Sequence, residues 1–411
     1  MHILHVTHRA WPAVGGSERY VHEIARRQVL DGHRVTVLAT DADDLSALWD
    51  RRGRRVDPGT AGMHQGVSIR RLPVRHLPLG RLAFPALRWL SWGLSHLSDR
   101  PALALARFSP WLPGLTRALR EAQPDLLFAW NITLEGLTAA VAREAAQRQV
   151  PWLAVPVLHL GRLRFYTMPH QLNLLRQAGV VLAQTPSERA FLLSHDFAPD
   201  QVRIVSPGVN LAEGCAADGG RFRRKYGVEG PLVLSLAMHC YEKGTHHLLA
   251  AAQRLWRNGE RLTLALLGPQ DAGVRRLLAR LPPAQRRRCI YPGEVPEAEK
   301  WDALDAADVV AMPSCTESFG IVFLEGWMRE KPVVGARSGA IPDVIDEGQD
   351  GLLVPFGDVA GLCRSISALL DDPALAARMG RRGLEKVERF YTWDRQYGRL
   401  SRIVDAVVGR E

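Results

Sequence analysis

Short apolar runs alternate with helix-like segments along most of the 411-residue chain, and this alternation limits the fold more than any other feature. The chain opens with a buried-strand pattern at 2–8, a loop at 9–16, helical periodicity at 17–30 and a second strand pattern at 34–39. A strand, helix and strand in this order form a crossover between parallel strands. The sequence therefore predicts an α/β fold of doubly wound parallel sheets.

The alternation occurs in two series, which indicates two domains. The first series ends with a strand pattern at 202–205, Ser206-Pro207-Gly208-Val209 breaks the rhythm, and the second begins at 232–237. A chain of this length accommodates two or three domains. We therefore expect a first domain at 1–207, a second at 208–390 and a final helix at 391–411 that crosses back to the first.

The bulk composition narrows the class of protein. There is no apolar run long enough for a transmembrane helix, and the N-terminus lacks the features of a signal peptide, so we expect a cytoplasmic protein. The five cysteines are odd in number and form no C-x-x-C pair, which argues against a disulfide framework and a zinc site.

The net charge of +10 comes mostly from arginine and indicates anionic partners. No nucleic-acid-binding motif is present, so we expect no nucleic acid partner. An anionic membrane surface and a diphosphate ligand fit better. The alternative is an arginine bias of the coding sequence with no partner behind it.

Residues 77–119 interrupt the alternation. Tryptophans 89, 92 and 111 lie among arginines, and leucines 87, 90, 94 and 97 fall at helical spacing. This composition suits a membrane interface or an acceptor segment. The alternative is a set of helices that cover one face of the first domain with their leucines in the core.

The second series carries the strongest candidate site. The run 313–325 ends a strand, presents Glu317 and starts a helix near Phe319-Gly320, whose free amides suit a phosphate. Glu325 lies in an otherwise apolar turn, so we expect it to have a ligand or a partner. Lys243 follows the first strand of this series, where doubly wound folds bind ligands, and its charge suits a diphosphate. A glycine-rich turn at 335–343 is expected near the same ligand, although Asp343 can equally cap the next turn.

The first series carries weaker candidates. Gly15 and Gly16 precede the first helix, where a ligand can approach the backbone closely, and Ser17 is the expected N-cap. Their spacing is not that of a nicotinamide-binding loop. His159 follows the strand pattern at 152–158, a position for a polar contact to a ligand, although a lone histidine is more often structural.

Together these motifs resemble glycosyltransferase family 4, the retaining glycosyltransferases of the GT-B fold. The two glutamates eight residues apart around Phe319-Gly320 are the most specific element, and the match covers nearly the whole chain. The resemblance implies two Rossmann-like domains that face each other across a cleft. The first would bind the acceptor, with its choice in the loops 41–66 and 77–119, and the second the nucleotide sugar.

The same resemblance implies roles for individual residues. Lys243 would contact the donor diphosphate, Glu317 would lie by the donor sugar and Glu325 would bind the ribose. The remaining positions would line the reacting groups: the amides of Phe319, Gly320 and Ile321 at the phosphate or sugar, Gly15 and Gly16 at the donor–acceptor junction, and His159 near the reacting sugar. Members of this family normally need no bound metal, so we expect neither a metal site nor a cofactor.

Two positions depart from the family pattern. The family usually has an arginine five residues before the lysine, where this chain has Met238, and a second family histidine corresponds to Trp130. Arg337, Arg9 and His239 are the candidates to replace the missing arginine.

The expected function is that of a hexosyltransferase. It would move a sugar from a UDP- or GDP-sugar to a glycan or lipid-linked acceptor, in surface polysaccharide or glycolipid synthesis, at the inner face of the plasma membrane. One alternative, which Met238 motivates, is a weak or inactive member that acts as a scaffold in a glycan assembly complex. Another is an enzyme that epimerises a sugar nucleotide, which the two glutamates disfavour.

Overall fold

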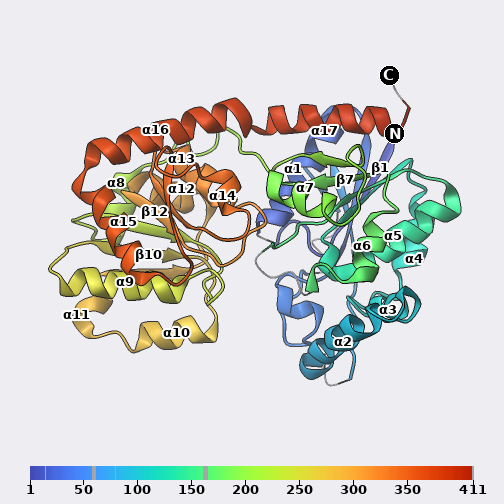
Figure 1. Cartoon of the computed structure of the whole chain (residues 1–411), viewed down its shortest axis with the longest axis horizontal. Helices are drawn as coiled ribbons and strands as arrows, with labels where there is room; N and C mark the ends of the chain where they lie inside the picture. Colours follow the sequence, from blue (N-terminus) through green and yellow to red (C-terminus); the bar gives the residue numbers. More distant parts are fainter. Residues whose placement is uncertain (14, 58–61, 79, 161–164, 410–411) are drawn as a thin grey trace. The chain divides into compact units, whose positions relative to one another are not determined.

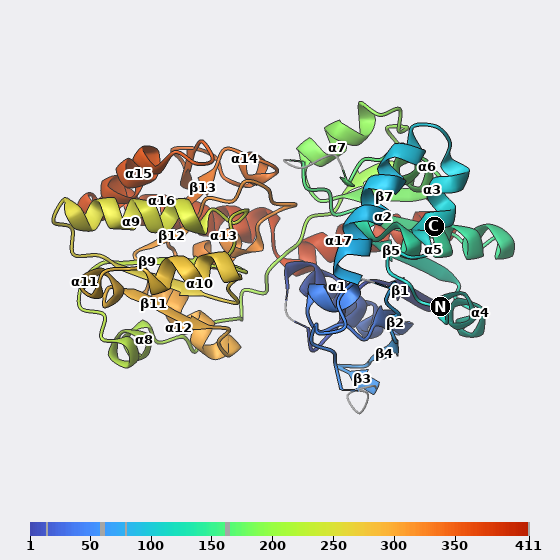
Figure 2. The same ribbon diagram turned by 90° about the horizontal axis from the view of Figure 1, so that it is seen from below.

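The computed structural model describes residues 1–409 except 14, 58–61, 79 and 161–164, and it divides into two compact units (Figure 1). The first unit contains Met1–Ser206 and Tyr397–Glu411, and the second contains Pro207–Gln396. Parts of the loops 41–66 and 77–119, namely 58–61 and 79, lie outside the described residues, as does residue 14 of the first loop. Each unit is a twisted sheet with helices on both faces (Figure 2).

In the described part of the first unit, eight strands form a sheet in the order β3-β4-β2-β1-β5-β6-β7-β8. Only β3 and β4 pair antiparallel, and the other neighbours are parallel. The strands are β1 (His2–Val6), β2 (Arg34–Thr40), β3 (Gly62–His64), β4 (Val67–Leu72), β5 (Leu126–Trp130), β6 (Trp152–Val155), β7 (Val180–Ala183) and β8 (Val202–Ile204). The helices are α1 (Gly16–Leu30), α2 (Gly80–Ser95), α3 (Asp99–Ala106), α4 (Leu115–Ala122), α5 (Glu135–Arg148), α6 (Pro169–Leu175) and α7 (Pro186–Leu193), with short 3₁₀ turns at Leu45–Leu48 and Ile132–Leu134.

The second unit has a wholly parallel sheet in the order β11-β10-β9-β12-β13-β14. Its strands are β9 (Leu232–Leu236), β10 (Thr263–Leu267), β11 (Cys289–Gly293), β12 (Val309–Met312), β13 (Val333–Ala336) and β14 (Gly351–Val354). Its helices are α8 (Gly219–Tyr226), α9 (Thr245–Arg257), α10 (Ala272–Ala279), α11 (Pro283–Arg286), α12 (Glu297–Ala306), α13 (Ile321–Trp327), α14 (Ile341–Val344), α15 (Val359–Asp371) and α16 (Pro373–Phe390). The last helix, α17 (Trp393–Val407), belongs to the first unit from Tyr397 onward. The predicted α/β fold with two doubly wound parallel sheets is confirmed.

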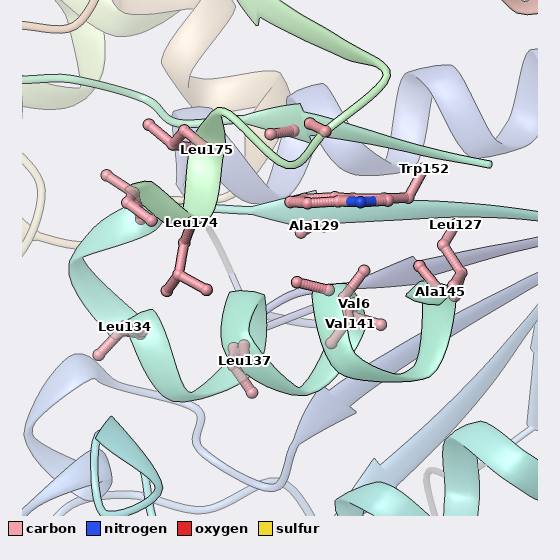
Figure 3. Close-up of a cluster of buried hydrophobic side chains, with 14 of the residues drawn as sticks. Val6, Leu127, Ala129, Leu134, Leu137, Val141, Ala145, Trp152, Leu174 and Leu175 are labelled. Carbon is pink, nitrogen blue, oxygen red and sulfur yellow. The ribbon is translucent and has the colours of Figure 1, made fainter. Parts of the chain in front are cut away.

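Alternation along the central strands builds a core on each face of each sheet. In the first unit, Leu137, Val141 and Ala145 of α5 pack on apolar side chains of β1, β5 and β6, and α6 adds to the same cluster (Figure 3). On the opposite face, the ring of Trp130 contacts both His5 of β1 and Tyr20 of α1. In the second unit, one face carries α8, α12 and α13 and the other carries α9, α10 and α15.

Two local expectations need correction. The N-cap of α1 is Gly15 and not Ser17, which lies in the first turn with a buried hydroxyl. The region 77–119 contains α2, α3 and α4, and its leucine stripe does not share one environment. Leu87 is buried, whereas Leu90 and Leu97 are exposed, because the buried side of α2 is set by contacts distant in sequence.

Strand β4 and helix α8 were not expected from the sequence, because Arg70 and Arg71 blur the strand pattern and half of the residues of α8 are charged. Among the described residues, no helix is long and apolar enough to cross a bilayer.

Candidate functional site

The second sheet reverses its strand order between β9 and β12. In doubly wound folds, ligands bind outside the carboxyl ends of the strands at such a point. The loop 237–244 follows β9 and the loop 313–320 follows β12, so both begin at this edge. The candidate residues on these two loops are therefore brought together by topology.

Lys243 and Glu317 form an ion pair across the reversal. The Lys243 Nζ lies 2.5 Å from the Glu317 Oε1, and the glutamate is buried whereas the lysine is partly exposed. The backbones of the loops are also joined, since the amide of Cys315 donates to the carbonyl of Glu242 at 2.8 Å. A buried carboxylate with a partly exposed ammonium group offers a ligand both a hydrogen-bond acceptor and a positive charge.

Gly244 allows the two loops to approach. Its φ is +71°, and a Cβ atom there would lie 2.1 Å from the carbonyl oxygen of Pro313. Glycine meets both demands, because it adopts positive φ freely and carries no side chain. The start of α9 can therefore lie directly against the loop that carries Glu317.

The helix α13 positions the second glutamate. Glu325 is buried, and its Oε1 lies 3.0 Å from the Nζ of Lys300 on α12. This is the partner that a charge in an apolar turn requires. Lys300 also pairs with Glu297 at 2.6 Å, and sequence reasoning did not single it out because α12 is distant in the chain.

The start of α13 holds the remaining second-unit candidates. Phe319 is buried with its ring 5.5 Å from that of Tyr391, Gly320 is the N-cap with a φ of +93°, and Ile321 is the first helical residue. Just before them, the hydroxyls of Ser314 and Thr316 are buried with no hydrogen-bond partner among the described residues. Buried polar groups are normally satisfied, so these two hydroxyls are further candidates for ligand contacts.

The glycine-rich turn after β13 supports Glu317. The amide of Ala340 donates to the Glu317 carbonyl at 3.2 Å, and the Ser338 hydroxyl donates to the Cys315 carbonyl at 2.5 Å. Asp343 lies in the first turn of α14. The turn therefore fixes the backbone of the 313–320 loop.

None of the three candidates for the missing arginine presents a free cation in the described structure. Burial lowers the pKa of His239 to about 4, and its ring nitrogens contact the Thr245 hydroxyl and the Leu267 carbonyl. Arg337 pairs with Glu347, and Arg9 pairs with Glu18. Met238 itself is 52% exposed, so its position is open to solvent.

In the first unit, the helix start after β1 already holds a carboxylate of the chain. Gly15 is extended, with its carbonyl accepting from the amide of Arg19 at 3.0 Å, and Gly16 begins α1. Glu18 is buried there and pairs with Arg9 at 2.7 Å and His8 at 3.3 Å. Although burial alone would raise the pKa of Glu18, the His8 hydrogen bond and the charges of His8 and Arg9 lower it to about 2. This acidic group in the first turn satisfies the preference of a helix start for negative charge.

His159 lies in the loop after β6, partly exposed, with its ring 5.1 Å from that of Tyr166. Two residues earlier, Val157 has a φ of +55°, which is unusual for a β-branched residue. Glu188 fixes this segment, since its Oε1 accepts from the amide of Leu158 at 3.0 Å. Backbone strain of this kind clusters at functional sites, so the conformation of Val157 supports His159 as a candidate site residue.

Trp130, at the second family-histidine position, is fully buried, and its indole nitrogen donates to His5 at 3.1 Å. This side chain belongs to the core.

A hollow of about 1050 Å³ in the first unit lies at the opposite edge of the sheet from the candidate residues, beside Met1, Asp125 and Pro151 at the amino ends of the strands. Among the described residues, no cluster of three or more His, Cys, Asp or Glu side chains is arranged to hold a metal ion.

Two family models match the chain, one in each of its two units. Residues 15–208 match the glycosyl transferase 4-like domain, and residues 221–386 match the glycosyl transferases group 1. A D-inositol 3-phosphate glycosyltransferase of Corynebacterium diphtheriae is 33% identical over 399 residues, which is 92% of this chain and 87% of that protein. The protein of the same name from Pseudarthrobacter chlorophenolicus is 37% identical over 213 residues, or 50% of each chain, and that from Corynebacterium efficiens is matched over 59% of its length.

Solved structures share the fold over the whole chain. Alr3699/HepE of Anabaena in complex with UDP has a TM-score of 0.74 at 18% identity, covering 99% of this chain and all of that one. Sucrose-phosphate synthase of Thermosynechococcus elongatus has a TM-score of 0.74 at 20% identity, covering all of both chains.

Proposed function

Because this chain belongs to the group 1 glycosyltransferases of the GT4 type, with the GT-B fold, we propose that it is a retaining hexosyltransferase that uses a nucleotide diphosphate sugar. The observation that carries the proposal is the Lys243–Glu317 pair at the strand-order reversal of the second sheet. UDP is the first donor nucleotide to test, since Alr3699/HepE was solved with UDP and with UDP-glucose, and GDP is the second.

In the proposed reaction, the second unit binds the donor. Lys243 offsets the charge of the diphosphate as it leaves, and the amides at Phe319, Gly320 and Ile321 add hydrogen-bond donors. Preorganised donors of this kind stabilise the developing charge without reorganisation. Glu317 and Glu325 accept hydrogen bonds from the sugar and ribose hydroxyls respectively. No step of this scheme uses a metal or a cofactor.

The first unit binds the acceptor in this proposal, with Gly15 and Gly16 at the donor–acceptor junction and His159 near the reacting sugar. The proposed acceptor is a glycan or a lipid-linked sugar in surface polysaccharide or glycolipid synthesis, which would place the chain in the cytoplasm, at the inner face of the plasma membrane. The names of the relatives support a second acceptor, D-inositol 3-phosphate. A transfer assay with both acceptors separates the two cases, because only one is expected to gain the sugar.

Donor binding is tested with UDP-, GDP- and ADP-sugars on the wild type and on Glu325→Ala. We expect one nucleotide sugar to bind and to be hydrolysed slowly, and the variant to bind it at least about tenfold more weakly, the effect of losing one charged hydrogen bond. Glu297→Ala is the matched control, because it removes the other carboxylate on Lys300. Equal losses in both variants would mean that Glu325 acts only through Lys300.

Met238 supports a second candidate function, a weak or inactive scaffold in a glycan assembly complex. It replaces the family arginine, and Arg337, Arg9 and His239 are each occupied within the chain. If no sugar in the panel binds the folded wild type, the transferase proposal fails and the scaffold takes its place.

A further inference from the structure

The helix α2 exposes its apolar side. Leu82, Trp89, Leu90 and, just past its end, Leu97 are 74%, 50%, 54% and 82% exposed. Their spacing follows one face of a helix. A surface helix of a soluble protein normally turns this face to the core, so α2 is oriented in the opposite sense.

The buried side of α2 is polar. Arg88, Ser91 and Ser95 are buried, with Leu87 beside them. Arg88 forms an ion pair with the buried Glu135 and donates to the carbonyl of Phe165 at 2.6 Å. Turning the helix to bury its leucines would leave Glu135 without its cation in the interior, at high energetic cost. The exposure of the leucines is thus fixed by the polar anchor beneath them.

The surrounding sequence supplies the charge that an anionic surface would attract. Residues 58–120 contain nine arginines and a single acidic residue, Asp99. The carboxylate of Asp99 already accepts from the Asn173 side chain at 2.6 Å. Four of the nine arginines pair with carboxylates outside the stretch, namely Arg70 and Arg117 with Glu121, Arg88 with Glu135 and Arg120 with Glu144. The charge offered to an anionic surface therefore comes from the others, of which Arg75, Arg100 and Arg107 are exposed.

We propose that the outward face of α2 docks on an anionic lipid bilayer. Leucine and tryptophan enter the boundary between headgroups and acyl chains, and the arginines nearby bind the anionic headgroups. A neutral protein partner would use the apolar face but not the charge around it. The inference rests on the proposed function where it concerns the acceptor. If the chain is a transferase, docking on a bilayer favours the lipid-linked acceptor over the soluble inositol phosphate.

The docking face also adjoins the segment that carries His159. The ring of Trp89 lies 5.4 Å from that of Phe165, and the next residue, Tyr166, lies against His159. A chain docked through α2 would hold this segment close to the bilayer, where a lipid-linked acceptor resides.

The test is sedimentation of the full chain with phosphatidylcholine vesicles, with and without about 30% phosphatidylglycerol, where anionic lipid should strengthen binding. We expect the double variant Leu90→Glu/Leu97→Glu to bind the anionic vesicles at least about tenfold more weakly than the wild type. The control Leu30→Glu/Leu211→Glu adds the same charge at exposed leucines elsewhere and should bind normally. Donor hydrolysis without vesicles is measured for all three proteins and should be equal.

Unchanged binding by the α2 double variant, or an equal loss in the control, would overturn the assignment to α2. If the wild type sediments with neither kind of vesicle, the lipid partner is wrong. If the wild type is then a dimer and the α2 double variant is a monomer, the face is a contact between two copies of the chain. A wild type that binds vesicles but hydrolyses no donor would contradict the proposed function and leave the docking surface standing.

Discussion

At the scale of single residues, the candidate donor site is defined by how charges are paired. Glu317 and Glu325 are buried and each is matched to one lysine, Lys243 and Lys300. His239 lies next to the lost arginine position but is buried and neutral. In the proposed donor site, the positive charge for a diphosphate is therefore concentrated on Lys243, so we expect one added cation to change donor affinity.

Met238→Arg is expected to tighten donor binding by about tenfold, because a charged hydrogen bond to phosphate contributes roughly 1.5 kcal/mol. Met238 is exposed, so the longer side chain has room. Isothermal titration with the donor measures the change, and Met63→Arg adds the same charge at an exposed site in the first unit. Equal affinity in both variants and the wild type would show that position 238 lies away from the diphosphate.

His239→Gln is expected to reduce the pH dependence of stability. The pKa of His239 is about 4 in the folded chain and 6.5 when exposed, so between these values the unfolded chain binds the extra proton. The free energy of unfolding of the wild type therefore falls as pH falls from 6.5 to 4, by up to about 1.4 kcal/mol per pH unit from this group.

The glutamine side chain that this variant introduces does not titrate, so the variant's loss of stability over the same range should be shallower by up to that amount. Urea unfolding at several pH values measures both slopes. Parallel curves for the two proteins would contradict the prediction.

At the scale of elements, close packing between two helices sets the position of Glu325. The helix α16 crosses α13 at Gly383, where a Cβ atom would lie 2.0 Å from the Cδ1 of Trp327. Trp327 is fully buried and its indole nitrogen donates to the Asp350 carbonyl at 2.9 Å, so the ring has little room to move. A contact more than fifty residues away in sequence thus fixes the helix that carries Glu325.

Gly383→Ala is expected to destabilise the chain by about 1–3 kcal/mol through overpacking and to weaken donor binding by displacing α13. Denaturant unfolding and donor titration measure the two effects. Gly398→Ala is the control on α17, where a Cβ atom meets nothing within 4 Å, and it should stabilise by roughly 0.5–1 kcal/mol. Similar effects in the two variants would mean that the contact with Trp327 is not the cause.

At the scale of the whole molecule, the chain consists of two units, each with its own sheet and its own cores. The proposed contacts to the diphosphate, the donor sugar and the ribose lie in one of them, since Lys243, Glu317 and Glu325 belong to Pro207–Gln396, whereas Gly15 and Gly16 at the proposed donor–acceptor junction belong to the other. The charge is distributed unevenly as well, with the acid-poor stretch 58–120 in the other unit.

We expect UDP alone to slow amide hydrogen exchange in the second unit, at the loops 237–244 and 313–320, and to leave the first unit unchanged. A bound ligand stabilises the unit that binds it by mass action, which suppresses local opening there. Hydrogen exchange followed by mass spectrometry resolves the two units. Protection of equal size at the loop of Gly15 and Gly16 would contradict a donor site made by the second unit.

Much of this architecture followed from local patterns. The repeated strand–helix alternation predicted the α/β class. The strand patterns expected at 2–8, 34–39, 202–205 and 232–237 lie within two residues of β1, β2, β8 and β9, because strand and helix periodicity is a property of neighbouring residues. The spacing of Glu317 and Glu325 around Phe319-Gly320 identified the candidate site for the same reason. The exceptions, such as β4 and α8, are elements whose charged residues hide the apolar pattern.

What the sequence determined by itself is the class of fold, the two series of elements and the carboxylates at the candidate site. Tertiary structure decided which groups meet: Lys300 with Glu325, Glu18 with Arg9, and Arg88 with Glu135 beneath an outward apolar face. The physical reason is that periodicity fixes which side chains share a face of a helix, whereas the direction of that face depends on partners far away in the chain. For α2, a buried ion pair prevailed over the burial of leucine.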